Sequence, residues 1–261
     1  MPGCREDLPG EAQRVGLADL HVHTSYSWDA NPRIEDLLTR AACIGLDVIA
    51  VTDHNTIRGA LKARRLAERL DLGVEVVVGE ELDTLQGHLI GLYLREFIPP
   101  RLTLAETLDL IHEQEGVAVC PHPGGPLPWH LGSRRIEEVS DRLDAIEISN
   151  SSWFAAAGRK RALSRNRKRY KLAITGGSDA HCLAALGHCS TSFNGTSALD
   201  LRRALEERTT RAYGEPLPFA KGLYSLGVKA QEAVAKAGFM ETPHYASLTT
   251  WARAGESGNE G

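Results

Sequence analysis

Two patterns of apolar and polar positions alternate along most of the chain. Seven short stretches rich in valine and isoleucine are almost continuously apolar, which is typical of strands buried on both faces. These stretches are LADLHVH (17–23), DVIAVTDH (47–54), VEVVVGEEL (74–82), HLIGLYL (88–94), VAVCPHP (117–123), AIEISN (145–150) and LAITGGSDAH (172–181). Between and after them lie amphipathic segments with helical spacing, at about 31–45, 56–72, 103–115, 134–142, 155–171 and 198–208. This alternation predicts an α/β fold with a mostly parallel sheet, closed into a TIM-barrel-like shape.

The two ends of the chain differ from this central part. Residues 1–16 are polar and interrupted by glycine and proline, so we expect a flexible N-terminal tail. The alternating pattern predicts a single domain over residues 17–214. Residues 215–261 form a C-terminal extension with one amphipathic helix at about 223–237, and we expect its final GESGNEG to be disordered.

Composition and charge narrow the class of protein. The 261 residues are 42% apolar and 25% charged, which is typical of a globular protein with a sizeable core. The 30 basic and 34 acidic residues give a net charge of −4, which argues against a protein that wraps nucleic acid over its whole surface. Five cysteines without a C-x-x-C pair predict neither a disulfide framework nor a zinc ribbon. Without a signal core or a run of about 18 apolar residues, we expect a cytoplasmic protein with no membrane attachment.

Residues of the types that bind metals follow most of the predicted strands. They are His21, His23, Asp53, His54, Glu80, Glu81, His122, Glu147, Asp179 and His181. In parallel α/β folds the C-terminal strand ends meet on one face, and H-x-H and D-x-H spacings put both side chains of a pair on one side of a strand. One such histidine alone is usually a core or capping residue, but a set from several strand ends predicts a metal site. Imidazoles and carboxylates without thiolates favour Zn²⁺, Mn²⁺ or Fe²⁺.

Seven of these stretches resemble the motifs of a known family. DLHVHTSYSWD, AVTDHNT, GEELDT, HLIGLYL, AVCPHPGG, AIEISN and GGSDAH resemble, in this order, the motifs of the PHP (polymerase and histidinol phosphatase) superfamily, and most of all its stand-alone metal-dependent phosphoesterases. The resemblance covers residues 17–214. It implies a distorted seven-stranded (β/α) barrel with a two- or three-metal centre at the C-terminal strand ends.

The resemblance also implies which residues bind each metal. His21, His23 and Asp179 would hold one metal, Asp29, His54 and His181 a second, and His88 and His122 a third, with Glu81 bridging the first and the third. The family pattern of glycine, any residue, then glutamate selects Glu81, and its neighbour Glu80 is the alternative. We expect Asp53 to orient an imidazole ring, while Glu147 either does the same or merely ends a strand.

Basic residues and one further histidine are candidates for contacts with a substrate phosphate. The loop PGGPLPWHLGSRR leaves a predicted strand just after His122, so we expect it to overhang the metals. It makes His130, Arg134 and Arg135 candidates, the alternative being that both arginines face solvent from the following helix. Arg159 is a further candidate, because its helix begins near a strand end.

The predicted ligands also indicate a reaction. Three divalent ions outweigh the charge of the carboxylates of Asp29, Glu81 and Asp179, so the centre would attract a phosphate ester. Metal-bound hydroxide would be the nucleophile. We therefore expect a metal-dependent phosphohydrolase that acts on a small phosphomonoester or a nucleotide phosphate, with two to three Mn²⁺, Zn²⁺ or Fe²⁺ ions.

A basic run keeps other functions open. Residues 159–171 carry eight lysines and arginines and no acidic residue, which is either a solvated helix face or a local track for a nucleic-acid backbone. The alternatives are a 5′→3′ exonuclease on short RNA or DNA, a histidinol-phosphatase-like enzyme, and a non-catalytic metal-containing module that binds nucleic acid or regulates. The patterns do not predict the oligomeric state.

Overall fold

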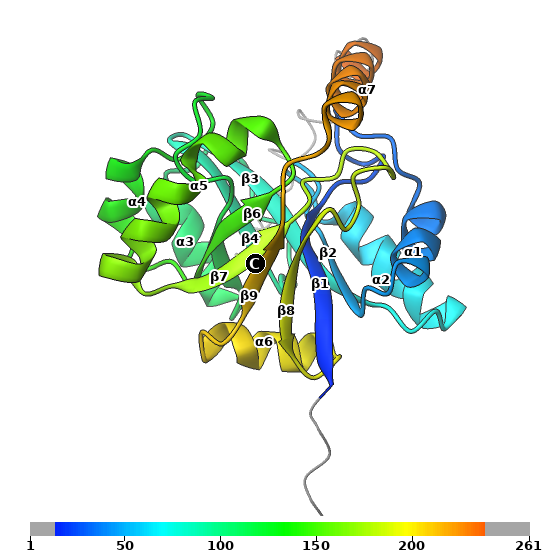
Figure 1. Ribbon diagram of the computed structural model, residues 1–261, viewed down its shortest axis with the longest axis horizontal. Coiled ribbons are helices and arrows are strands. Elements are labelled where there is room, and N and C mark those ends of the chain that lie inside the picture. Colours follow the sequence, from blue (N-terminus) through cyan, green and yellow to red (C-terminus); the bar gives the residue numbers. More distant parts are fainter. Residues whose placement is uncertain (1–13, 238–261) are drawn as a thin grey trace, which may run out of the picture.

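In the computed structural model, which describes residues 14–237, the strands lie side by side at the centre and helices flank them on both sides (Figure 1). The strands are β1 (Val15–Val22), β2 (Val48–Val51), β3 (Glu75–Thr84), β4 (Gly87–Leu92), β5 (Val117–Cys120), β6 (Ala145–Asn150), β7 (Ala173–Gly177), β8 (Cys189–Asn194) and β9 (Arg211–Gly214). The helices are α1 (Ile34–Cys43), α2 (Arg58–Leu70), α3 (Leu104–Glu113), α4 (Ser133–Val139), α5 (Trp153–Arg165), the π-helix η1 (Asn166–Tyr170), α6 (Ala198–Glu206) and α7 (Phe219–Ala237). The expectations for the tail up to residue 13 and for the GESGNEG end lie outside the described residues.

All of these strands belong to one sheet, in the order β7-β6-β5-β4-β3-β2-β1-β8-β9. The pairs β1–β2, β2–β3, β5–β6 and β6–β7 are parallel, and the pairs β3–β4, β4–β5, β1–β8 and β8–β9 are antiparallel. Two expectations were therefore wrong, because the described chain has nine strands rather than seven and its sheet is mixed rather than mostly parallel. β4 is antiparallel to β3 because a short turn, with no crossover helix, joins them.

The two unpredicted strands nearly close the sheet into a barrel. β8 has the sequence CSTSFN and β9 has RAYG, so neither forms the apolar run that marks a buried strand. The hydroxyl of Thr191 on β8 accepts from the amide of Gly176 on β7 and donates to its carbonyl, each over 2.8 Å. Just beyond the end of β7, the amide of His23 donates to the carbonyl of Ala180 over 3.0 Å.

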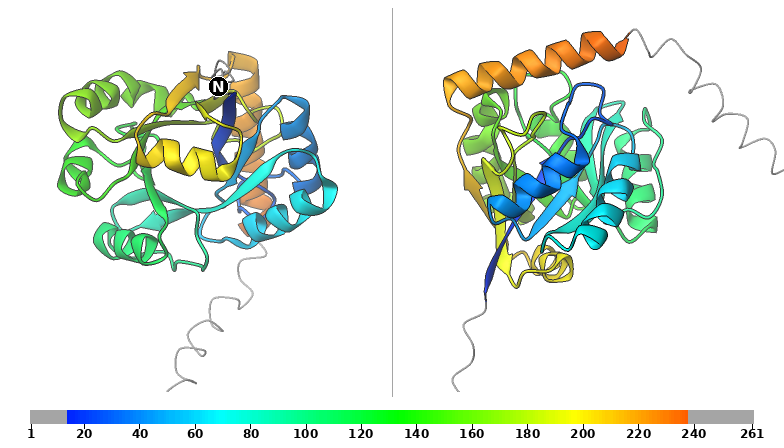
Figure 2. Two further views of the ribbon diagram at one scale, coloured as in Figure 1. Left: turned by 90° about the horizontal axis from the view of Figure 1, so that it is seen from below. Right: turned by 90° about the vertical axis from the view of Figure 1, so that its right-hand side faces the viewer.

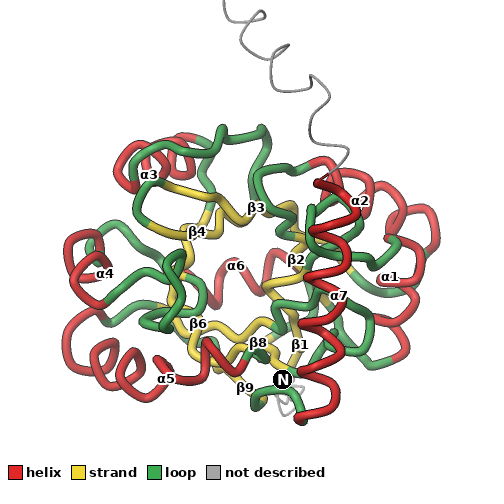
Figure 3. Tube along the Cα trace, turned by 90° about the horizontal axis from the view of Figure 1, so that it is seen from above, coloured by secondary structure: helices red, strands yellow, loops and turns green. Residues whose placement is uncertain are grey.

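Apolar side chains pack on both faces of the strands. An outer cluster lies between the strands and helices α1 to α5, and an inner cluster fills the lower part of the barrel. The inner cluster includes Leu201, Ala204 and Leu205 of α6, so this helix closes one end of the barrel. The outer helices surround the ring in the view along its axis (Figure 3).

The opposite end of the barrel, where the parallel strands end, carries α7 (Figure 2). The last described turn of α7 is attached to the loop between β1 and α1. There the ammonium group of Lys236 donates to the carbonyl oxygens of Ser25, Ser27 and Ala30, over 3.2, 2.7 and 2.7 Å. No helix within residues 14–237 is both long enough and apolar enough to cross a membrane.

Candidate metal centre

Side chains that point into the barrel change from apolar to polar toward the end that α7 covers. On β3, Val77 belongs to the inner apolar cluster, and Glu81 and Asp83 follow on the same face of the strand. β4 runs in the opposite direction, so His88 precedes Ile90, which belongs to the inner cluster. The alternation of each strand thus places an apolar floor under a layer of chelating side chains.

In β1, a break in the alternation of side chains brings two histidines into the same layer of chelating residues. Ala18 and Leu20 belong to the inner cluster, so strict alternation would next turn Val22 inward and leave His21 and His23 outside. The register of β1 with β2 shifts just before Val22, and Val22 packs in the outer cluster instead. A bulge of this kind re-aims the side chains that follow it, and here it turns both histidines toward the other chelating residues.

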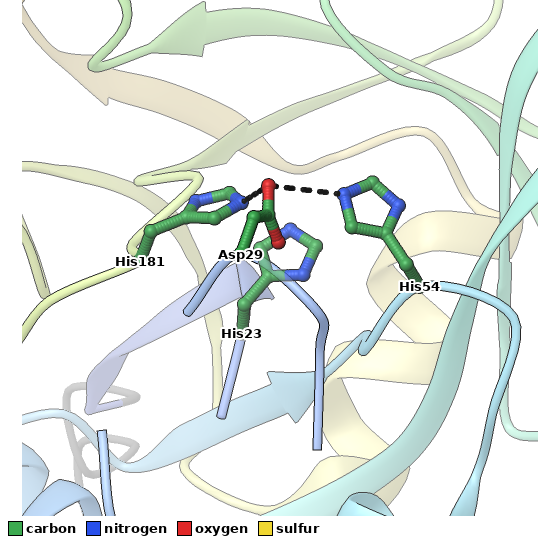
Figure 4. Close-up of side chains that lie close together, drawn as sticks. All are labelled: His23, Asp29, His54 and His181. Carbon is green, nitrogen blue, oxygen red and sulfur yellow. Dashed lines mark ion pairs between the residues drawn. The ribbon is translucent and has the colours of Figure 1, made fainter. Parts of the chain in front are cut away.

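His23, Asp29, His54 and His181 form one compact group, in which one ligand atom of each lies within 4.8 Å of the others (Figure 4). Asp29 comes from the loop after β1. Its Oδ2 lies 2.9 Å from Nε2 of His181 and 3.7 Å from Nε2 of His54. The structure therefore brings together the three residues expected around the second metal and adds His23 to them.

Glu81 lies between two further groups. Its Oε1 is 2.9 Å from Nδ1 of His88 and 3.0 Å from Nε2 of His122. Its Oε2 is 3.2 Å from Nε2 of His21 and 3.3 Å from Nε2 of His23. One buried carboxylate thus reaches residues of both the first and the third expected set.

Asp179 lies beside the first set. Its Oδ1 is 3.6 Å from Nε2 of His21 and 3.5 Å from Nε2 of His23. The backbones of Asp179 and His122 have φ angles of 52° and 31°, in the left-handed region that side chains disfavour. Such backbone strain is concentrated at functional sites, where the surrounding structure enforces it.

Glu80, the alternative to Glu81, points away from these groups. It lies on the outward face of β3, where its Oε2 accepts a hydrogen bond from the amide of Ile98 over 3.1 Å. Burial raises the pKa of Glu80 to about 8, so its carboxyl group is mostly protonated at neutral pH. Of the two neighbours, only Glu81 offers a charged carboxylate to the cluster.

The charges within the cluster are interdependent. Burial alone would raise the pKa of Glu81, but the imidazoles of His21 and His88 help to hold that pKa well below its usual range. Against the opposing effect of burial, contacts with carboxylates raise the pKa values of His23 and His88 to about 9. Burial lowers the pKa of His54 to about 3. Without metal, the cluster is therefore a mixture of charged and neutral imidazoles around charged carboxylates.

Glu147 fixes the ring of His21, and Gly177 leaves the room that this contact needs. The Oε1 of Glu147 lies 3.1 Å from Nδ1 of His21, and its Oε2 accepts from the amide of His122 over 2.8 Å. Gly177 is required here, because a Cβ at this position would lie 2.4 Å from Cβ of His21 and 2.7 Å from Oε1 of Glu147. Glu147 thus orients an imidazole ring, as one of the two interpretations of the sequence expected.

The ring of His23 is held through a hydroxyl group. Its Nδ1 lies 3.0 Å from Oγ of Ser27, and Ser27 in turn donates to Oδ1 of Asp53 over 3.1 Å. Asp53 also accepts from the amide and the hydroxyl of Thr24, over 2.6 and 2.8 Å. Asp53 therefore orients an imidazole, as expected, but acts through Ser27 rather than by direct contact.

The buried cluster contains polar atoms that the protein leaves without hydrogen-bond partners. Among the described residues these atoms include Asp29 Oδ1, His54 Nδ1 and His122 Nδ1, and Nε2 of His23 and of His181 lie 3.3 and 2.9 Å from carboxylate oxygens without forming a hydrogen bond. Buried polar atoms without partners are costly and rare, and a ligand that binds them removes this cost. Since neutral imidazoles and carboxylates are the donors that Zn²⁺, Mn²⁺ and Fe²⁺ accept, the residues present fit a centre for such ions.

Two residues near the cluster were not predicted from the sequence. Oδ1 of Asp83 lies 3.1 Å from Nε2 of His88, and its two-residue spacing from Glu81 was the available signal. Nζ of Lys229, on α7, lies 3.6 Å from Oδ1 of Asp179. Only the path of the chain across the barrel end brings Lys229 there, and no motif around it indicates this.

A cavity of about 590 Å³ opens above the cluster. The chelating residues Asp29, His54, Glu81, His88, His122 and Asp179 line one side. The remainder is largely aromatic or aliphatic, with Trp28, Leu127, Trp129, Trp153, Phe154, Leu217 and Leu226. This size and this mixture of apolar walls with a few polar groups are typical of a site for a small molecule.

His130 lines this cavity, as expected for a residue of the overhanging loop. Its ring stacks on that of His122, with centroids 4.3 Å apart. Burial, followed by the nearby His122, lowers the pKa of His130 to about 3. It is therefore a neutral imidazole at physiological pH.

The three arginines expected near a substrate lie elsewhere. Arg134 and Arg135 project from α4 and both bond to Glu138, each over 3.0 Å, and neither lines the cavity. Arg159 donates to the carbonyl of Gly214 and to Glu215 instead. Arg134 and Arg135 take the alternative arrangement expected from the sequence, facing solvent from the following helix, because the loop turns into α4 before Arg134. Arg159, on α5, does not line the cavity either.

The basic run forms the second half of α5 and η1, on the outside of the barrel (Figure 1). Lys160, Arg161, Arg167 and Lys168 are exposed, and Arg169 contacts Glu137. None of its lysines or arginines is among the described residues that line the cavity.

Comparisons with known proteins agree with this geometry. A family model described as the PHP domain matches residues 19–182, and a PHP-associated model matches residues 160–210. An uncharacterized protein of Methanocaldococcus jannaschii is 42% identical over 144 residues, which cover 51% of this chain and 81% of that protein. The phosphoribosyl 1,2-cyclic phosphate 1,2-diphosphodiesterase of Eggerthella lenta is 39% identical over 103 residues, which cover 37% of this chain and 38% of that enzyme.

A solved structure shares the fold. It is a two-domain protein from Bacteroides vulgatus that contains a predicted PHP-like metal-dependent phosphoesterase, with a TM-score of 0.66 and 19% identity. The similarity covers 87% of this chain and 74% of that protein. At this identity it supports the barrel architecture alone. Since the PHP domain model matches more than half of the chain, from Asp19 to Cys182, the chain belongs to the PHP domain family.

Proposed function

We propose that this protein is a metal-dependent phosphohydrolase that cleaves a small phosphomonoester with two to three divalent ions. The observation that carries this proposal is the buried set of chelating atoms without hydrogen-bond partners beneath the cavity. The PHP domain match and the diphosphodiesterase relative support a phosphoester as the substrate.

The proposed ligands are the nine residues of the cluster. His21, His23 and Asp179 form the first set, Asp29, His54 and His181 the second, and His88 and His122 the third, with Glu81 between the first and the third. Divalent ions held by these residues would attract a phosphate group and activate water for attack on it. The nine residues, from several strands and loops, would hold such ions in fixed positions.

Other residues fix this arrangement and shape the cavity above it. Glu147 and Ser27 hold the rings of His21 and His23, so that each ring presents its Nε2 to the cluster. The neutral imidazole of His130 offers a hydrogen bond to a phosphate oxygen from the side of the cavity. The aromatic walls exclude water from the rest of the substrate.

Metal removal and return tests the proposal. After treatment with a chelator, we expect phosphate release from p-nitrophenyl phosphate and from nucleoside monophosphates to fall at least about 100-fold, and to recover on addition of Mn²⁺. His54→Ala should abolish the recovery. His112→Ala is a matched control, because its ring lies outside the cavity and contacts Asp144. Absence of phosphate release with Mn²⁺, Zn²⁺ or Fe²⁺ would contradict the proposal.

A further inference from the structure

Helix α7 forms one wall of the cavity above the cluster. Gly222, Ser225, Leu226, Lys229, Ala230 and Ala233 line it, at the three- and four-residue spacing of one helix face. Lys236 fixes the end of this helix to the loop that carries Trp28 and Asp29. α7 is therefore attached to the cluster's own loop, and it runs across one side of the ring of strands in the view along the barrel axis (Figure 3).

Lys229 brings a positive charge into this wall. It is the only lysine or arginine among the described residues that line the cavity. Its side chain is 31% exposed, and within residues 14–237 its one ion pair is with Asp179, at 3.6 Å. No second carboxylate of that part of the chain lies within ion-pair distance of it.

This pairing changes when Asp179 binds a metal. The carboxylate of Asp179 belongs to a group with His21 and His23 that fits a divalent ion, and a bound ion takes up its negative charge. The ammonium group of Lys229 then lacks a counter-charge in a cavity with largely apolar walls. A phosphate group in the cavity would supply it, through a charge-assisted hydrogen bond.

Two tryptophans flank the cluster at the cavity's rim. The ring of Trp28 stacks on His54 with centroids 5.7 Å apart, and the ring of Trp129 stacks on His88 at 6.2 Å. Both side chains nevertheless remain about half-exposed, at 41% and 45%. Indole surfaces in this position favour a planar or apolar group beside the phosphate.

We propose that α7 completes the substrate site, with Lys229 binding the phosphate and the indoles of Trp28 and Trp129 binding a planar group attached to it. The inference rests on the proposed function and deepens it. The substrate is then a small phosphomonoester of a planar or apolar alcohol, such as a nucleoside. The cavity of about 590 Å³ matches one such molecule rather than a polynucleotide.

The first test replaces the charge of Lys229. In Mn²⁺-loaded Lys229→Met, we expect the Kd for inorganic phosphate, measured by calorimetry, and the KM for adenosine 5′-monophosphate to rise about 10- to 100-fold. Manganese content should stay unchanged, and Lys229→Arg should recover most of the phosphate affinity. Lys221→Met is the matched control, because this exposed lysine of the same helix does not line the cavity.

Two outcomes would overturn the role of Lys229. An unchanged phosphate affinity would show that its ammonium group does not contact the phosphate. A loss of manganese from Lys229→Met would show that it acts by holding Asp179 instead. Because both measurements are of binding, they remain decisive even if no phosphomonoester is hydrolysed, an outcome that would contradict the proposed function alone.

The second test concerns the planar group. Adenosine 5′-monophosphate and ribose 5-phosphate share a primary phosphate ester and differ in the base. We expect kcat/KM to be about 10-fold or more higher for the nucleotide, and Trp129→Ala to remove most of this difference. Equal kcat/KM values for the two compounds in the wild-type protein would overturn the recognition of a planar group.

Discussion

Two regions of this protein are dense in chemically active side chains, and they differ in what surrounds those side chains. The cluster at the strand ends is buried, and several of its polar atoms have no hydrogen-bond partner among the described residues. The basic run of α5 and η1 is largely exposed, and two of its arginines, Arg159 and Arg169, pair with nearby glutamates. In the sequence, both regions are visible as concentrations of charged or chelating residues.

This difference shows that a concentration of polar side chains indicates function when it is buried. Exposed cations on a helix keep their hydration, so their presence costs the fold almost nothing and needs no functional explanation. Buried imidazoles and carboxylates lose their hydration, and a fold retains them only when something else compensates for the loss. Changes in the cluster should therefore have large effects on the proposed activity, and changes in the basic run small ones.

The largest expected effect comes from the two adjacent glutamates of β3. Glu81→Gln removes a carboxylate that contacts five histidines, so we expect lower metal content and a loss of about 1,000-fold in phosphomonoester turnover. Glu80→Gln is its matched control. Because burial already keeps Glu80 mostly protonated at pH 7, turnover should change less than about 2-fold. Similar losses in both variants, measured by metal analysis and phosphate release, would remove Glu81 from the proposed ligands.

An intermediate effect is expected on the pH dependence of metal affinity, because metal ions and protons compete for the same imidazoles. In the metal-free protein the pKa of His21 is raised well above its ordinary value, and those of His23 and His88 are raised to about 9. All three rings are thus protonated at pH 7 and must lose their protons to bind metal. Metal binding at pH 7 should release about three protons, and affinity should rise with pH up to about 9.

Calorimetry in buffers of different ionisation enthalpy measures these released protons. His54 supplies an internal contrast, because burial lowers its pKa to about 3 and it is neutral before metal binds. A metal affinity that stays flat between pH 7 and pH 9 would show that the three rings are not charged in the metal-free protein.

The smallest expected effect tests the other region. Replacing the exposed residues Arg161, Arg167 and Lys168 with serine should change turnover of a small phosphomonoester by less than about 2-fold, since these side chains lie outside the cavity. The same variant should be compared with the wild type on a single-stranded oligonucleotide at several salt concentrations. If oligonucleotide turnover depends on salt and is lower in the variant, the basic run binds nucleic acid. The functional difference between the two regions would then not hold.

Periodicity predicted those parts of the fold that burial alone specifies. All seven apolar runs are strands, because continuous valine and isoleucine reflect burial on both faces. β8 is also buried but uses the hydroxyl of Thr191 to bond with β7, so no apolar run marks it. The bulge in β1 can be read from the sequence. The inward apolar residues Ala18 and Leu20 have even numbers and His21 and His23 have odd ones, so all four face inward only if the alternation is broken.

The C-terminal strand ends indicated most of the residues that meet, since the topology of the sheet brings them to one face, whereas Asp29, in a loop, and His88, at the start of β4, came only from the family resemblance. Helix-borne residues were not predictable in this way. Arg134 and Arg135 follow a cluster residue closely in sequence and yet face solvent. Lys229 lies far from the motifs and reaches the cavity, because the chain after β9 crosses back over the barrel. The number of residues between a side chain and a chelating residue therefore does not predict whether that side chain lines the cavity.

The cavity's two sides come from different parts of the chain, and this decides how independently each can change. The chelating residues lie within residues matched by the PHP domain model, whereas α7 lies beyond residue 210, where the second matched model ends. Apart from Lys229 and Lys236, which contact Asp179 and the loop that carries Asp29, the residues of α7 could therefore change without altering the strand ends that hold the cluster. A barrel of this family with a different helix in this place would keep the same chelating residues beneath a cavity of different shape and charge.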